Sequence, residues 1–231
     1  ARWLAYIKPL DSLPCRTTQY DSDWGLVPNV RNIWDTYTRG GAPCKSALPA
    51  KLSAVADAAF YLTPPANPVW TRDRALRVMF LLRRQKACLA SGGQCDYSAA
   101  ETQALQSAFL QYEMKRLPSE VWTNNERCFD LGTEPSMKFW SLLVDIFWSD
   151  LSDEQKAKIA APMNPRIDCY LQQADSKDWS LYNGNNWTPV LNAGALYWAI
   201  AYYHEDPRAK NVLREALQTL WLHRDFYLTD G

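Results

Sequence analysis

The sequence predicts an all-α protein built from antiparallel helical hairpins. Most segments after residue 48 carry apolar residues at spacings of three and four, as one face of a helix requires. Almost no segment alternates apolar and polar residues in the manner of a strand. Proline and glycine break the helical pattern at short intervals, and short connections favour antiparallel neighbouring helices.

The chain divides by composition into two regions. Residues 1–47 contain proline, glycine and scattered aromatic residues without a sustained period, so we expect an irregular N-terminal arm. Residues 48–231 are expected to form the helical domain.

The first helices of that domain are predicted between clear breaks. One runs from about Pro49 to Leu62, before the segment TPPANP interrupts the pattern. The stretch WTRDRALRVMFLLRRQKACLAS then resumes helical spacing, and because its middle is apolar nearly all round we expect a buried helix. Gly92 and Gly93 are expected to stop it.

Capping signals place the next three helices. Ser98 and Glu101 form a capping-box pair, and Pro118 is expected to end the helix that they open. Thr133 opens a second helix, with Pro135 in its first turn. The third begins at the capping pair Ser152 and Gln155, and the pattern predicts that two prolines interrupt it: Pro162 and Pro165.

The last two helices are predicted on either side of Asp206. The apolar segment after residue 186 is expected to remain helical to about Glu205. Asp206 is the expected N-cap of the final helix and Pro207 its first residue. The residues expected to face inward are Val212, Leu213, Ala216 and Leu220.

Composition excludes some classes of function. Lys plus Arg and Asp plus Glu each number 25, so no net charge is available to hold nucleic acid or an anionic membrane. The longest apolar run, Ala193–Tyr203, is much shorter than the roughly 20 residues of a membrane-spanning helix. The chain begins without an initiator methionine or a signal-like segment, which favours a processed mature terminus.

Six cysteines indicate disulfide bonds. They form no CxxC pair and only two histidines accompany them, so a structural metal site is poorly supported. Disulfides imply a secreted, periplasmic or extracellular protein. Six thiols allow fifteen complete pairings; the short loop favours Cys88 with Cys95, and we expect Cys15 with Cys44 and Cys128 with Cys169. The alternative is a cytosolic protein with buried free thiols.

Two segments carry a resemblance to a known family. They are CFDLGTEPSMKFWSLLVDIFWSDLSDEQKAKI and NNWTPVLNAGALYWAIAYYHEDPRAKNVLREAL, and both resemble the heparinase II/III-like polysaccharide lyases. The resemblance covers roughly the C-terminal hundred residues. The matching positions are Leu151, Ser152, Glu154, Gln155, Asn185, Asn186, Trp187, Val190, Asn192, Ala193 and Gly194.

The resemblance implies a fold and a reaction. The fold is an incomplete (α/α) toroid of helical hairpins, whose inner ends line a groove for an acidic polysaccharide. The reaction is β-elimination: a base removes the C5 proton of a uronic acid, its carboxylate takes up negative charge, and the 4-linked sugar departs. No cofactor and no metal is expected.

The asparagines are the expected catalytic residues. Asn185 and Asn186 would neutralise the uronate carboxylate, because an amide donates two N–H groups without a titratable charge. Capping alone would account for one of these amides. Asn192 is expected to face either the groove or a buried polar partner. The residues expected to stack on sugar rings are Trp179, Tyr182 and Trp187, although Trp187 also has the spacing of a core residue.

The base is missing from the expected set. Related lyases often carry histidine directly after the asparagine, where this chain has Trp187, and both His204 and His223 lie near expected helix ends, where histidine favours the helix dipole. The segment that would carry the family's catalytic tyrosine is expected beyond Gly231. We therefore expect a second polypeptide that continues after Gly231, with a truncated fragment as the alternative.

Two other classes of function stay open. A glycoside hydrolase on an α/α toroid needs two carboxyl groups, and the candidates Asp145, Asp150, Asp175 and Asp178 offer no distinctive pair. A noncatalytic glycan-binding module is favoured by Trp187 in place of histidine. One helix also concentrates arginines that either bind anionic groups or form a solvated face: Arg72, Arg74, Arg77, Arg83 and Arg84.

Overall fold

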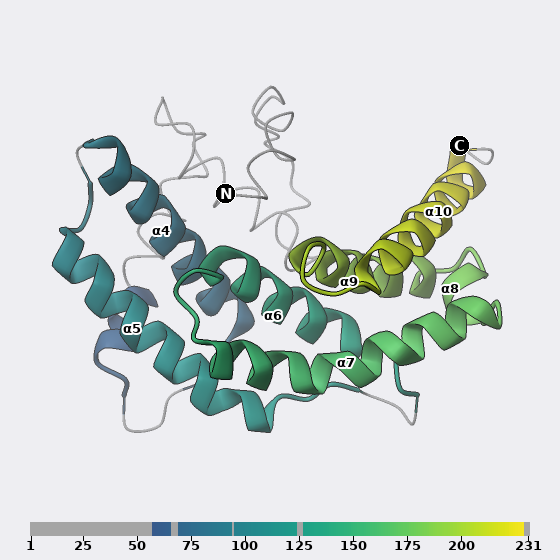
Figure 1. The fold of residues 1–231 in the computed structure, drawn as a ribbon, viewed down its shortest axis with the longest axis horizontal. Helices are drawn as coiled ribbons and strands as arrows, with labels where there is room; N and C mark the ends of the chain where they lie inside the picture. The colour runs from purple at the N-terminus through teal and green to yellow at the C-terminus, as the bar shows by residue number, and fades with distance from the viewer. Residues whose placement is uncertain (1–56, 66–68, 94, 124–126, 229–231) are drawn as a thin grey trace. The chain divides into compact units, whose positions relative to one another are not determined.

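The structure is a computed structural model that describes residues 57–65, 69–93, 95–123 and 127–228 (Figure 1). The predicted arm over residues 1–47 and the expected pair Cys15 and Cys44 lie outside these residues. Within them all regular structure is helical and no strand occurs, which confirms the predicted all-α class. The chain forms two compact units, Ala1–Arg116 and Leu117–Gly231.

The first unit contains the end of the first predicted helix, over residues 57–62, followed by α4 (Arg72–Ser91) and α5 (Ala99–Arg116). Gly92 ends α4 in the left-handed conformation with φ 68°, as the sequence predicts. The capping box of α5 is formed: Ser98 N–H donates to Glu101, and Glu101 N–H donates to Ser98 Oγ. A disulfide joins Cys88, near the end of α4, to Cys95 in the segment before α5.

Three arginines of α4 take part in ion pairs within the first unit. Arg74 Nε lies 3.1 Å from Asp57 Oδ1, and Arg77 Nε lies 2.5 Å from Asp57 Oδ2. Arg84 pairs with Asp96 at 3.1 Å. These contacts support a structural role for this run of charge rather than recognition of an external anion.

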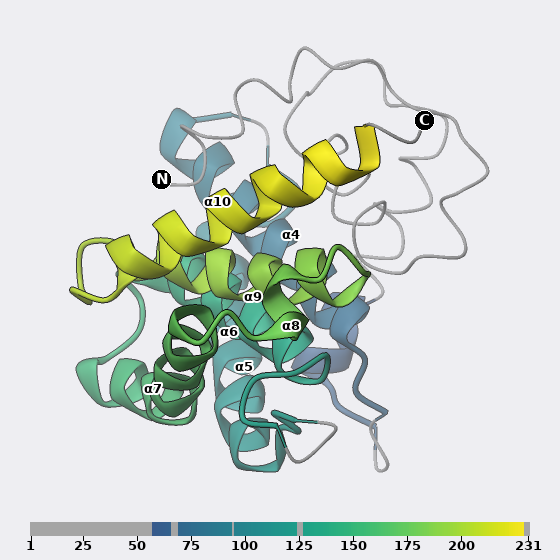
Figure 2. The same cartoon turned by 90° about the vertical axis from the view of Figure 1, so that its right-hand side faces the viewer.

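The second unit is organised around α9. It contains η3 (Leu117–Ser119), α6 (Thr133–Phe147), α7 (Asp153–Asp175), α8 (Trp179–Tyr182), α9 (Trp187–Ala201) and α10 (Ala209–Leu228). Helix α9 packs against α6 and α10, and α8 leads into it (Figure 2). Its fully buried residues include Leu191, Ala195, Trp198 and Ala199.

Gly194 permits the close contact between α9 and α6. A Cβ placed on this residue would lie 3.0 Å from the Cα of Glu134 and 3.2 Å from its Cβ. A larger residue would force the two helices apart. The glycine of the NAG segment therefore has a packing role in this structure.

The expectation that Pro162 and Pro165 interrupt their helix is wrong. Helix α7 begins at the predicted capping box of Ser152 and Gln155 and continues through both prolines to Asp175. Each proline removes one N–H donor, which leaves the carbonyls of Lys158 and Ala161 without a helical partner. Both are exposed residues, so water can replace the missing donors.

The boundary between α9 and α10 also differs from the prediction. Helix α9 ends at Ala201, four residues before Glu205, and α10 begins at Ala209 rather than at Pro207. Asp206 still makes the expected type of contact, since its Oδ1 accepts a 2.9 Å hydrogen bond from Arg208 N–H. Val212 and Ala216 are fully buried, as expected, whereas Leu213 and Leu220 are partly exposed.

Candidate functional site

The asparagines of the matching motif lie at the junction between α8 and α9. Gly184 adopts a left-handed φ of 61° in this turn. Asn185 Oδ1 accepts a 2.9 Å hydrogen bond from Trp187 N–H, so this amide satisfies a donor at the start of α9. Asn186 occupies the N-cap position without a side-chain capping bond and is exposed. One amide therefore caps the helix, and its neighbour lies on the surface.

Asn192 lies inside the second unit. Its side chain is 0% exposed; Oδ1 accepts a 2.7 Å hydrogen bond from Tyr170 Oη, and Nδ2 donates to Leu181 O and Thr188 O at 3.3 and 2.7 Å. Of the two environments expected for this residue, the structure has the buried polar one. In this conformation Asn192 joins α7, α8 and α9 and presents no surface to a ligand.

Two tryptophans form the main aromatic feature of the junction. The ring centroids of Trp179 and Trp187 lie 5.3 Å apart with a tilt of 49° between the rings. Trp179 is 47% exposed. Arg127 places its guanidinium 5.0 Å from the centroid of Trp179. We refer to Arg127, Trp179 and Trp187 as the tryptophan surface.

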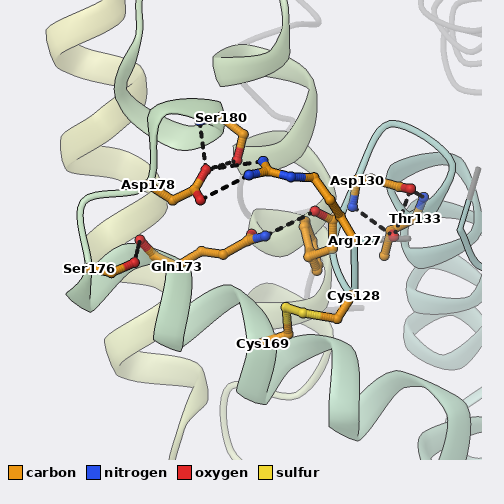
Figure 3. The surroundings of a disulfide bond; sticks show 10 residues. Arg127, Cys128, Asp130, Thr133, Cys169, Gln173, Ser176, Asp178 and Ser180 are labelled. Carbon is orange, nitrogen blue, oxygen red and sulfur yellow. Dashed lines mark hydrogen bonds and ion pairs between the residues drawn. A yellow bond between two sulfur atoms is a disulfide. The ribbon is translucent and has the colours of Figure 1, made fainter. Parts of the chain in front are cut away.

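Arg127 is held by Asp178. Its Nη1 and Nη2 donate to the two carboxylate oxygens of Asp178 at 3.2 and 3.1 Å, a paired arrangement (Figure 3). Asp178 also caps α8, since Oδ1 accepts from Ser180 N and Oγ at 2.9 and 2.7 Å. Partial burial raises the pKa of Asp178, but the hydrogen bonds from Ser180 and Arg127 outweigh it and the pKa is lowered overall.

Tyr182 takes a different position from the two tryptophans. Its hydroxyl lies 3.3 Å from Ala174 O and 3.4 Å from Glu215 Oε2, and it accepts a 3.2 Å hydrogen bond from Lys177 Nζ. These contacts connect α8 with the end of α7 and with α10. Tyr182 therefore supports the junction from within the second unit.

His204 lies away from the asparagines. His204 follows the C-terminal end of α9, while Asn185 and Asn186 precede its N-terminal end. Because α9 has 15 residues, its two ends are about 22 Å apart. His223 is on α10, where partial burial lowers its pKa. His204 is therefore not placed to act on a sugar held at the asparagines.

The disulfide Cys128–Cys169 lies beside this region and matches the expected pairing (Figure 3). Together with Cys88–Cys95 it accounts for all four cysteines that the structure describes. Over the described part of the chain, histidine, cysteine and acidic side chains form no group of three that could hold a metal ion. No helix in that part has the length and apolar character required to cross a membrane.

Comparison with family models, with curated proteins and with solved structures finds no significant match. The resemblance to polysaccharide lyases therefore rests on the sequence motifs alone.

Sequence reasoning missed Arg127. The sequence offers Asp178 as one carboxylate of a hydrolase, whereas in the structure its two oxygens bind Arg127 and Ser180. A usable signal was present: Arg127 directly precedes Cys128, whose expected partner Cys169 lies nine residues before Asp178 in the chain. A disulfide between these segments brings their neighbours together.

Proposed function

We propose that this chain is the helical part of a secreted polysaccharide lyase that acts on a uronic-acid polymer. The tryptophan surface, with Asn185 and Asn186, would bind the polymer. The observation that carries the proposal is the exposed Trp179 packed against the half-buried Trp187, next to the exposed amide of Asn186 at the start of a 15-residue helix.

The chemistry of a uronate suits this junction. Tryptophan rings offer large flat apolar surfaces, which match the C–H faces of sugar rings. The start of a helix carries partial positive charge and favours a carboxylate. The exposed Asn186 amide adds two N–H donors, which can hold that carboxylate as charge develops in the transition state.

The reaction would be β-elimination. A base takes the C5 proton, its electron pair forms the C4–C5 double bond, and the C4–O bond breaks with its electrons on the departing sugar, which takes up a proton. This chain would supply the donors that stabilise the carboxylate. The base would come from the polypeptide that we expect to continue after Gly231.

The remaining parts of the proposal follow the same resemblance. The helices would form part of an (α/α) toroid, and the two disulfides support an extracellular or periplasmic location. Helix α10 exposes Leu217, Trp221 and Leu222 by half or more of their surface, which supports a partner polypeptide on this face. An intact-mass spectrum of natively purified material, recorded under denaturing conditions, tests that partner: a second chain supports it and a single chain that remains monomeric contradicts it.

The decisive experiment measures binding and products with alginate and hyaluronan. Asn186→Ala and Trp187→Ala should each weaken binding, whereas the exposed controls Asn211→Ala and Tyr203→Ala should not. Product analysis then separates the classes: an unsaturated, ultraviolet-absorbing end identifies a lyase, and a new reducing end alone identifies a hydrolase. Wild-type protein that binds neither polymer would overturn the proposal for these substrates.

A noncatalytic glycan-binding module is the second candidate. It is favoured by Trp187 in the position where related lyases often carry histidine, and by the distance of His204 from the asparagines. This function predicts binding to the tryptophan surface with no change in polymer length. Viscosity of the polymer solution over time distinguishes it from either enzyme.

A further inference from the structure

The loop that precedes α6 is fastened to α7 at three points. Cys128 is bonded to Cys169, with Cα atoms 6.0 Å apart. The ring of Phe129 packs 5.3 Å from that of Tyr170, and Gln173 Nε2 donates to Phe129 O at 3.3 Å. The three residues on α7 lie within about one helical turn. These contacts therefore hold in place the backbone next to the residue that precedes Cys128.

That residue, Arg127, connects the fastened loop to the junction of α8 and α9. It forms two hydrogen bonds to Asp178, the N-cap of α8, and its guanidinium lies over Trp179, the first residue of α8. Because Asp178 satisfies both Nη groups, the charge of Arg127 is neutralised within the protein. This arrangement suits a support for the aromatic ring better than a receptor for a sugar carboxylate.

We propose that Arg127, fixed by the Cys128–Cys169 disulfide and paired with Asp178, is the positioning residue that orients Trp179 against Trp187 for sugar binding. The inference rests on the proposed function. It assigns different roles to two residues. Arg127 fixes the orientation of the Trp179 ring, and the exposed amide of Asn186 binds the anionic group.

The physical reason is preorganisation. A half-exposed tryptophan on a four-residue helix can sample several rotamers, and ordering it on binding weakens affinity. A guanidinium over the ring, itself held by a carboxylate, favours one orientation before the ligand arrives. Loss of Arg127 should therefore weaken binding of alginate or hyaluronan by about three- to tenfold.

The experiment follows two readouts in Arg127→Ala and Arg127→Lys. The first is the circular dichroism of the tryptophan pair, defined as the difference between wild type and Trp187→Phe. The second is affinity for alginate and hyaluronan at low and high salt. Arg127→Ala should lose the pair signal and bind more weakly by the same factor at both salt concentrations. Arg127→Lys, which keeps the charge without the paired hydrogen bonds, should lie between it and wild type.

Matched controls separate positioning from general damage. Arg214→Ala removes an exposed arginine that, like Arg127, contacts a carboxylate, and it should change neither readout. The double variant of Cys128 and Cys169 to serine should reproduce the Arg127→Ala effects, whereas the same change at Cys88 and Cys95 should not. Thermal unfolding confirms that each variant is folded at the assay temperature, and Arg127→Lys replaces Arg127→Ala if the latter unfolds.

The outcomes distinguish the inference from the proposed function. If wild type binds neither polymer, the proposed function fails. The pair signal in the Arg127 variants still tests whether Arg127 orients Trp179: its loss supports this role and its persistence contradicts it. If Arg127→Ala keeps both the signal and the affinity, the inference is overturned. A loss of affinity that disappears at high salt would also overturn it, because that pattern marks direct contact between Arg127 and the anionic polymer.

Discussion

Replacement of Asn192 tests whether this residue serves the fold or a ligand. Asn192→Ala removes an acceptor from Tyr170 Oη and a donor from the carbonyls of Leu181 and Thr188, all inside the second unit. Each hydrogen bond contributes about 0.5–1.5 kcal/mol net, and buried groups left without a partner cost about 1–3 kcal/mol. We expect a total loss of about 2–4 kcal/mol in the free energy of unfolding.

The assay is thermal unfolding followed by far-ultraviolet circular dichroism. A loss of about 3 kcal/mol should lower Tm by about 6–12 °C in a chain of this size. Tyr170→Phe should cost about 1–3 kcal/mol, because it leaves the buried Oδ1 of Asn192 without its donor. The double variant should lose less than the sum of the two single losses, since both changes break one shared bond.

The opposite pattern would refute this reasoning. If Asn192→Ala leaves Tm unchanged and abolishes binding of alginate or hyaluronan, the residue faces a ligand in solution. The control is Asn211→Ala, which removes an exposed asparagine from α10 and should leave Tm within about 1 °C of wild type.

Three further predictions concern packing, pH and covalent links. Gly194→Ala should destabilise the chain by about 1–3 kcal/mol, because the new Cβ meets the backbone of α6 at 3.0 Å, and a denaturant titration that detects no loss would contradict this contact. The hydrogen bond from Arg208 lowers the pKa of Asp206 below its ordinary value of 3.8. The ionised carboxylate therefore stabilises the fold above that value, and this stability is lost as the pH falls through the lowered pKa. In Asp206→Asn, Tm should fall less steeply at acid pH than in wild type. Loop-closure entropy predicts that removing Cys128–Cys169, which spans 41 residues, costs about 4 kcal/mol of stability, and that removing Cys88–Cys95, which spans 7, costs about 2.4 kcal/mol. In denaturant titrations the double variant of Cys128 and Cys169 should therefore be less stable than the double variant of Cys88 and Cys95.

Local signals were sufficient for the starts of α5 and α7. The capping pairs at Ser98 with Glu101 and at Ser152 with Gln155 are both formed as predicted. These motifs act between residues three apart, so their geometry depends only on the adjacent chain. The same holds for Gly92, whose left-handed conformation requires no distant contact.

The prediction that prolines interrupt α7 failed because both prolines free carbonyl groups of exposed residues. A missing N–H breaks a helix only if its carbonyl partner stays unsatisfied. The carbonyls freed by Pro162 and Pro165 belong to exposed residues, whereas the buried side of α7 carries Ile159, Met163 and Ile167. Apolar packing along that buried side keeps α7 continuous, and the pattern of prolines alone could not reveal it.

The sequence by itself determined the helical class, the starts of α5, α6 and α7, and the presence of asparagines and tryptophans between residues 179 and 187. Those features follow from spacing and local hydrogen bonds, which act over a few residues. The tertiary structure alone decided that Asn192 is buried against Tyr170 and that Arg127 holds Asp178 beside Trp179. Both contacts join residues more than 20 positions apart, and their partners are selected by how the helices pack and not by the residue types.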